Sequence, residues 1–264
     1  MKRKRHSIYL HILLGTFILF LSIKSYNQNT KWESCNTLMT DVIQDNPDAF
    51  HAYLVRADGF YLSGDFDQAL IDYDNAEARN PRHETIYINR ANVYASQKQF
   101  SEAIEELNNA IKLSNAHPEA YFNRGLAYFN MGDYNAAITD FNKAIGVEND
   151  YALAYLYRGV SKGILNHMND AVIDLQQAIQ LDPKNPKAYF SLGVAKSKLK
   201  DYPKAIELFT ESISLKPDYA DAYLQRGIAL LMQKKTKTYC KDFHQAKKYG
   251  NPLADKFIEQ YCKD

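Results

Sequence analysis

Apolar residues along most of the chain recur at helical spacing, in blocks that repeat every 34 residues. The segment 120–127 reads AYFNRGLA, and shifts of 34 residues give AYLYRGVS, AYFSLGVA and AYLQRGIA. The same shift backwards gives IYINRA from residue 86 and AYLVRA from residue 52. Six repeats follow one another without insertion or deletion, and their ranges are 50–83, 84–117, 118–151, 152–185, 186–219 and 220–253. A fixed period of this length indicates a repeat architecture.

Each repeat predicts two antiparallel helices joined by a tight turn. Apolar positions follow helical spacing in two blocks, which are interrupted near positions 15 and 16 by pairs such as Gly64-Asp65 and Gly132-Asp133. Position 4 is Tyr in all six repeats, and positions 8, 20 and 27 carry small residues in nearly all. Small residues let helix axes approach closely, and large residues fill the space between them. We therefore predict an all-α chain, an α-solenoid in which each repeat buries its second face against its neighbour.

This pattern resembles the tetratricopeptide repeat (TPR) family, in which an aromatic residue, a small residue, and then Ala, an aromatic residue, Ala and Pro occupy set places in 34 residues. The resemblance covers residues 50–253. It departs from the family at Tyr239, where Ala is usual, and at position 7, which is Arg in most repeats. It implies helix-turn-helix repeats stacked into a right-handed superhelix. Residues 26–49 are expected to form a linker and a half-repeat helix, and residues 254–264 a capping helix.

Positions 7 and 23 vary together, which predicts an ion pair inside each repeat. Five repeats carry Arg at position 7 and Asp or Glu at position 23, whereas the repeat 186–219 has Leu192 and Leu208. These positions are too far apart to meet along one helix, so the side chains must meet across the hairpin. Packed apolar residues can replace a buried ion pair at little cost, which favours a structural role over a catalytic one. The expected pairs are Arg56–Asp72, Arg90–Glu106, Arg124–Asp140, Arg158–Asp174 and Arg226–Asp242.

Residues 1–25 predict a secretory signal peptide or a membrane anchor. A basic stretch precedes an apolar run from Ile8 to Ile23, an order typical of export signals. The run is long for a cleaved signal and slightly short for a membrane span of about 20 residues. Both interpretations stay open, beside a buried helix of the fold. The basic flank keeps the N-terminus in the cytoplasm and sends the remainder across the membrane. We therefore expect an exported protein, either periplasmic in a bacterium, anchored facing the non-cytoplasmic side, or secreted.

The charge of the chain argues against nucleic acid as a partner. The whole sequence has a net charge of +1, and cleavage after Ser25 would remove five basic residues and no acidic ones, which leaves −4. Proteins that bind nucleic acids present a basic surface to the phosphates. We expect no nucleic-acid partner, and contact with a membrane only through an uncleaved N-terminal segment.

Cys240 and Cys262 are expected to lie opposite each other. Their midpoint falls in the turn Gly250-Asn251-Pro252, so antiparallel helices that fold there bring the two residues together. In an oxidising compartment this arrangement predicts a disulfide that closes the end of the solenoid, and two packed thiols are the alternative. Cys35 lies at the other end of the chain, and the cysteine spacing does not provide a metal site.

The candidate binding surface is an apolar strip along the first helix of each repeat. In TPR proteins these helices line a concave groove, chiefly through positions 2, 5, 9, 12 and 13. Exposed apolar strips usually mark protein contacts, and partial burial between adjacent helices is the alternative. The Lys and Asn residues with which some TPR domains grip a C-terminal carboxylate are mostly replaced here. The expected groove residues are Leu54, Ile88, Phe122, Leu126, Phe129, Leu156, Val160, Phe190, Val194 and Leu224.

The sequence contains no enzyme motif that we recognise: no glycine-rich phosphate loop, nucleophile elbow or HExxH motif. We expect no catalytic residue, no metal and no cofactor. The predicted function is a non-catalytic scaffold that binds a protein or peptide partner in the groove. The alternative is a structural spacer or assembly subunit of a cell-envelope complex, which would use its ends or its convex face.

Overall fold

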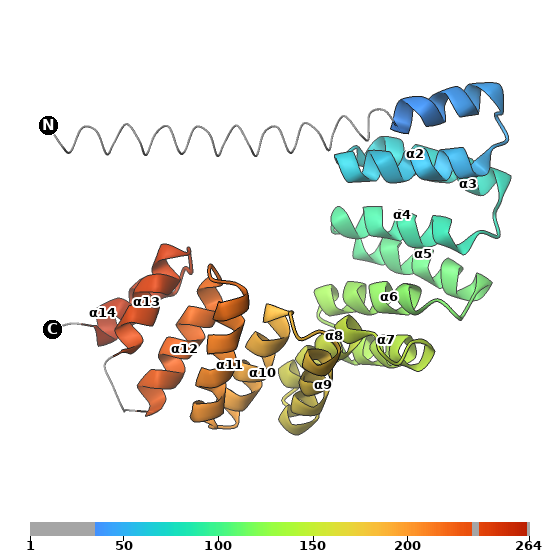
Figure 1. Ribbon diagram of the computed structural model, residues 1–264. Helices are drawn as coiled ribbons and strands as arrows, with labels where there is room; N and C mark the ends of the chain where they lie inside the picture. The colour runs from blue at the N-terminus through green and yellow to red at the C-terminus, as the bar shows by residue number, and fades with distance from the viewer. Residues whose placement is uncertain (1–34, 234–237, 263–264) are drawn as a thin grey trace, which may run out of the picture. The chain divides into compact units, whose positions relative to one another are not determined.

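The computed structural model describes residues 35–233 and 238–262, whose regular structure is entirely helical (Figure 1). The expected signal peptide or anchor, residues 1–25, lies outside the described residues. Residues 35–45 form the first helix. The labelled helices are α2 Phe50–Ser63, α3 Phe66–Arg79, α4 Glu84–Ser96, α5 Phe100–Leu113, α6 Pro118–Met131, α7 Tyr134–Val147, α8 Ala152–Ile164, α9 Met168–Leu181, α10 Pro186–Lys198, α11 Tyr202–Leu215, α12 Ala220–Gln233, α13 Tyr239–Lys248 and α14 Ala254–Tyr261.

The helices belong to two compact units, an N-terminal unit that ends at Asn115 and a C-terminal unit that begins at Ala116. Within each unit, consecutive helices pack as hairpins, α2 with α3 and α4 with α5 in the first, and four further hairpins from α6 to α13 in the second. None of the helices in residues 35–233 and 238–262 combines the length and the hydrophobicity needed to cross a bilayer.

Two hairpins, α2–α3 and α6–α7, turn at a Gly-Asp pair in positions 15 and 16, whereas Lys98, Asn166 and Lys200 adopt a positive φ at position 15 of the second, fourth and fifth repeats. Gly64 ends α2 with a φ of 86°, a left-handed conformation that suits glycine. Asp65 then caps α3, because its side chain accepts a hydrogen bond from the amide of Gln68. Asp133 caps α7 in the same way. The Gly-Asp pairs therefore end one helix and start the next, as the sequence predicts.

The small residues at position 8 allow the two helices of a hairpin to approach closely. In the C-terminal unit this position is Gly, and a Cβ added at Gly193 would lie only 2.6 Å from Cε1 of Phe209. Phe209 is fully buried, as are Phe141 and Phe243 at the equivalent position 24 of other repeats. The large residue of the second helix thus fills the space left by the glycine of the first.

The structure forms each of the five expected ion pairs across its hairpin. Asp72, Asp140, Asp174 and Asp242 accept two hydrogen bonds each from the paired arginine, at 2.6–2.9 Å, and Arg90 donates one to Glu106 at 2.8 Å. The four aspartates are buried. In the repeat without the pair, Leu192 and Leu208 are buried in one hydrophobic cluster. The hairpin therefore closes with either an ion pair or two leucines at the same place.

The arginines also link successive repeats, a contact that the repeat pattern does not predict. Arg56 donates a hydrogen bond to Oγ1 of Thr40 at 3.0 Å, and Arg158 donates one to Oδ1 of Asn142 at 2.6 Å. Arg226 reaches Thr210 in the same manner. Each acceptor lies sixteen residues before its arginine, at position 25 of the preceding repeat. The guanidinium groups also lie 5.1–5.8 Å from the ring of the Tyr at position 4 of their own repeat, a cation–π distance.

A polar contact of another kind joins α2, α3 and α4. Asp58 accepts hydrogen bonds from the hydroxyl of Tyr73 at 2.6 Å and from Nδ2 of Asn89 at 2.9 Å. Burial raises the pKa of Asp58, and the two hydrogen bonds counteract this rise only in part.

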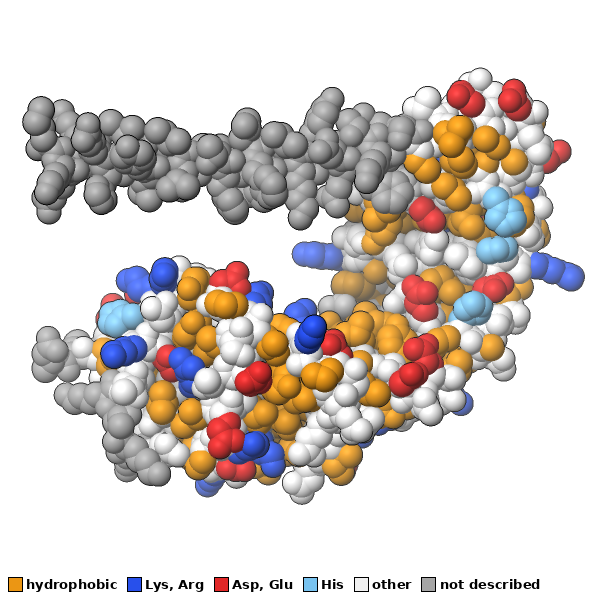
Figure 2. All heavy atoms as spheres, in the orientation of Figure 1, with side chains coloured by type: hydrophobic (Ala, Val, Ile, Leu, Met, Phe, Trp, Pro, Cys, Tyr) orange, Lys and Arg blue, Asp and Glu red, His pale blue; other side chains and the backbone are white. Residues whose placement is uncertain are grey.

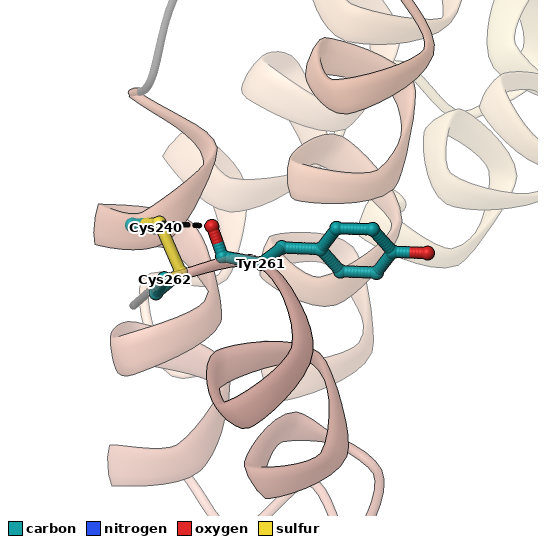
Figure 3. Close-up of a disulfide and its surroundings, with 3 residues drawn as sticks. All are labelled: Cys240, Tyr261 and Cys262. Carbon is teal, nitrogen blue, oxygen red and sulfur yellow. Dashed lines mark hydrogen bonds between the residues drawn. A yellow bond between two sulfur atoms is a disulfide. The ribbon is translucent and has the colours of Figure 1, made fainter. Parts of the chain in front are cut away.

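The C-terminal end of the chain is closed by a disulfide between Cys240 and Cys262, whose Cα atoms are 5.7 Å apart (Figure 3). It joins α13 to the residue that follows α14. Phe243 of α13 and Phe257 of α14 pack with their ring centroids 5.2 Å apart, so the capping helix is held by both a covalent bond and an apolar contact. Cys35 is a free thiol.

Candidate functional site

The ten side chains expected to line a groove do not form one exposed strip. Five residues at position 5 are buried, with only 3–8% of their surface exposed, namely Leu54, Ile88, Phe122, Leu156 and Leu224. They belong to the packed core, where Phe122 contacts the Phe141 cluster and Leu224 the Phe243 cluster. The expectation that these five side chains present a docking surface is therefore wrong, because they are covered by their own neighbours.

The other five expected groove residues are half-buried, and three of them meet in one open pocket of the C-terminal unit. Leu126 and Phe129 instead pack against the hydrophobic cluster around Phe122. The pocket has a volume of about 160 Å³ and lies between α8, the start of α9 and α10. We call it the α8–α10 pocket. Its walls include Val160, Gly163, Met168, Phe190, Val194 and Lys198.

Two glycines of α8 shape this pocket in different ways. A Cβ at Gly159 would lie 2.9 Å from Cγ of Leu175, so the close contact of α8 with α9 requires glycine there. A Cβ at Gly163 would meet only Cβ of Ala171, at 3.8 Å, which is an ordinary contact. Gly163 is therefore not needed for packing, and its missing side chain leaves the pocket open.

One sequence feature of this pocket is the residue at position 12 of the fourth repeat. Gly163 occupies position 12 of the fourth repeat, where the third repeat has Phe129 and the sixth has Leu231. The first helix of the fourth repeat thus lacks the large side chain that the first, third and sixth repeats carry at this position. Position 12 is also small in the second and fifth repeats, as Ala95 and Ser197, so this position alone does not single out the fourth repeat.

The pocket is suited to hold one large apolar side chain. Its lining is apolar apart from Ser191 and Lys198, and an apolar cavity of about 150 Å³ in another protein holds a benzene molecule. Burying a Leu or Phe side chain there would contribute roughly 1.5–3 kcal/mol. Ile164, which lines the pocket and is 47% exposed, adds apolar surface. On the face drawn in Figure 2, hydrophobic side chains of the C-terminal unit gather in patches among charged ones.

The pocket does not bring together groups that could perform a reaction. Among the residues that line the pocket, Lys198 is the one with a titratable side chain. In the part of the chain that the structure describes, no three His, Cys, Asp or Glu side chains come together as a metal site. What the arrangement offers is a shaped apolar surface.

The sequence matches family models of tetratricopeptide repeats. A model described as TPR repeat matches residues 91–132 and 165–200, and one described as tetratricopeptide repeat matches residues 118–151 and 186–219. The last two ranges have the same bounds as the third and fifth repeats. The chain therefore contains tetratricopeptide repeats, and these models indicate no enzyme family. No curated protein sequence matches the chain.

Solved structures that resemble this chain include MamA and two proteins described as TPR or tetratricopeptide repeat proteins. MamA is 25% identical with a TM-score of 0.57, and the match covers 69% of this chain and 96% of MamA. YrrB, described as a TPR protein with an unusual peptide-binding site, is 19% identical with a TM-score of 0.58, covering 75% of this chain and 98% of YrrB. A tetratricopeptide repeat protein from Parabacteroides merdae is 20% identical with a TM-score of 0.66, covering 91% and 96% of the two chains. The latter two likenesses establish the all-α solenoid fold alone.

Proposed function

We propose that this chain is a non-catalytic scaffold that binds a protein or peptide partner by receiving a large apolar side chain of that partner in the α8–α10 pocket. The observation that carries the proposal is the open apolar cavity of about 160 Å³ beside Gly163. Concave apolar surfaces are the usual places where proteins bind ligands or partners. The fold it shares with YrrB, a protein described as having a peptide-binding site, is consistent with this use.

The test is a variant that fills the pocket without disturbing its walls. Gly163→Leu introduces the side chain that the sixth repeat already carries at the same position, and the Cβ has room. Ala95→Leu is the matched control, since it makes a similar change at position 12 of the second repeat, in the other unit. Peptides would be selected from a phage-displayed random library on the wild-type chain, then synthesised and titrated against all three proteins.

We expect the selected peptides to share a large apolar residue and to bind the Gly163→Leu variant at least tenfold more weakly, while Ala95→Leu binds as the wild type does. Equal binding to the wild type and to Gly163→Leu would place the site elsewhere. Failure to enrich any peptide would favour a spacer or assembly subunit that uses its ends or its convex face.

We also propose that the protein works outside the cytoplasm. The basic and apolar residues 1–25 have the order of an export signal, and the bond between Cys240 and Cys262 is of a kind that persists in oxidising compartments. Fractionation of cells that produce the full chain, followed by mass spectrometry of its N-terminus, tests both location and cleavage. Recovery of the protein in the cytoplasmic fraction with free thiols at both positions would contradict the proposal.

A further inference from the structure

A second cavity, of about 490 Å³, lies beside the α8–α10 pocket and is bordered by lysines. Its apolar side is formed by Leu153 and Tyr157 of α8, and Lys184, Lys187 and Lys216 stand around it. We call it the lysine pocket. It collects side chains from two consecutive repeats, since Lys184 lies at the end of the fourth repeat, and Lys187 and Lys216 lie near the start and the end of the fifth.

The protein neutralises only part of the positive charge of the lysine pocket, since three lysines and one aspartate line it. Within the described part of the chain, none of the three ammonium groups makes a salt bridge, although Lys216 lies 5.1 Å from the ring centroid of Tyr219. Among the described residues that line the cavity, Asp182 is the single acid, and its Oδ1 accepts a hydrogen bond from the backbone amide of Lys184. Three cations around a concave surface create a positive potential that attracts anionic groups.

The two pockets lie on one face of the same pair of helices. On α8, residues 153, 157, 160 and 163 are spaced by three or four positions, as are residues 187, 190, 194 and 198 on α10, so each set forms one stripe. Lys187 and Val194 are seven residues apart, which is about 10 Å along a helix. An extended segment covers that distance in about three residues.

We propose that the partner is an acidic segment, whose carboxylates bind the lysine pocket while a large apolar side chain about three residues away enters the α8–α10 pocket. This inference rests on the proposed function and adds the chemistry of the partner. The contrast between the two cavities carries it, because one is apolar and the other combines unpaired ammonium groups with an aromatic wall. A segment with that spacing would satisfy both at once.

The probes are two synthetic peptides, GSDDSGFGS and GSKKSGFGS, each also made in reverse order, titrated against the ¹⁵N-labelled full chain by NMR. This method detects binding in the millimolar range. We expect one order of the acidic peptide to bind about tenfold more tightly than its basic counterpart at low salt, since two carboxylates would each gain a modest interaction with exposed lysines. The advantage should shrink at high salt, and amide shifts should fall on α8 and α10.

Two charge-reversed variants separate a local effect from a general one. Lys187→Glu with Lys216→Glu should abolish the preference for the acidic peptide. Lys143→Glu with Lys241→Glu is the matched control, because it changes the net charge equally at exposed lysines outside both pockets, and it should keep the preference. An equal loss in both variants would overturn the proposal.

The remaining outcomes distinguish this inference from the function on which it rests. If both peptides bind equally and Gly163→Leu weakens both, the apolar pocket binds partners but the preference for acidic segments is wrong. If neither peptide binds at millimolar concentration in either order, both proposals fail.

Discussion

Replacing Arg56 by Leu should destabilise the N-terminal unit by about 3 kcal/mol, and replacing Asp72 by Leu as well should restore most of that loss. Arg56 donates to both carboxylate oxygens of Asp72, at 2.7 and 2.8 Å, and the Asp72 side chain is only 3% exposed. Removing one partner of a buried pair costs about 3–5 kcal/mol. The arginine side chain is 18% exposed, so water reaches part of the site, and we expect the lower end of that range.

The double variant should behave differently because the chain already contains its equivalent. Leu192 and Leu208 occupy the same two positions in the fifth repeat and are 4% and 7% exposed. Two leucines in the first repeat would leave no buried charge. The losses that remain are the hydrogen bond from Arg56 to Thr40, worth about 1 kcal/mol, and the cation–π contact with Tyr53, which the added apolar surface of the leucines offsets at least in part. We therefore expect the double variant within about 1 kcal/mol of the wild type, with an interaction energy of 2 kcal/mol or more in the cycle, roughly at the upper end for contacting residues.

The assay combines urea unfolding followed by circular dichroism with hydrogen exchange of the amides of α2 and α3. Exchange is needed because repeat proteins do not always unfold in one cooperative step. Arg56→Leu should increase exchange in both helices, and the added Asp72→Leu should reverse the increase. If the double variant is as unstable as Arg56→Leu alone, two leucines cannot replace the buried ion pair, and the reasoning is refuted.

Three further changes test other parts of the fold. Asp58→Asn keeps an oxygen that accepts both hydrogen bonds but removes a half-buried charge. Because the pKa of Asp58 is raised above its ordinary value of 3.8, its contribution to stability is complete below that pH and is lost as the pH rises through the raised pKa. Thermal melts from pH 4 to 7 should show this loss in the wild type only, and parallel curves would contradict it. Cys240→Ser should cost about 3 kcal/mol and raise hydrogen exchange in α13 and α14, whereas Cys35→Ser, which removes a free thiol, should not. Gly193→Ala should destabilise by about 1–3 kcal/mol through overpacking, and Gly146→Ala, whose Cβ would meet nothing within 4 Å, should stabilise by up to about 1 kcal/mol. Chemical denaturation of the two variants compares them, and an equal effect at both glycines would count against the packing argument.

Most of the fold could be predicted because the same types of residue recur at the same positions in successive repeats. The small residue at position 8 recurs in all six repeats, the ion pair in five and the Gly-Asp turn in two, so each observation is checked in at least one other repeat. The pairing of Arg56 with Asp72 was deduced from the single repeat in which both residues change to Leu. The hydrogen bond from Arg56 to Thr40 could not be predicted in this way. The acceptor at position 25 varies among Thr, Asp, Asn and Gln, and these residues share only a side-chain oxygen.

The binding surface was harder to predict than the fold. Position 5 is apolar in every repeat, and that pattern is the same whether the side chain faces a partner or the next helix. The structure buries Phe122 and Leu224 within their own clusters, so apolar character alone could not decide between the two. The α8–α10 pocket and the lysine pocket depend on residues that differ between repeats, such as Gly163 and Lys216. A pattern built from what the repeats share does not include such residues.

The arginine that links successive repeats also affects how such a chain can change in length. The loss or gain of one complete 34-residue segment would place each position 7 arginine opposite another position 25. From Thr40 to Thr210, every one of those positions carries a side-chain oxygen that can accept a hydrogen bond. Any of the first five repeats can therefore precede a repeat that carries the arginine and offer an oxygen acceptor to its guanidinium group. The hydrogen bond between successive repeats is therefore kept when one repeat replaces another. Unequal recombination between repeats would then yield longer or shorter relatives that still fold.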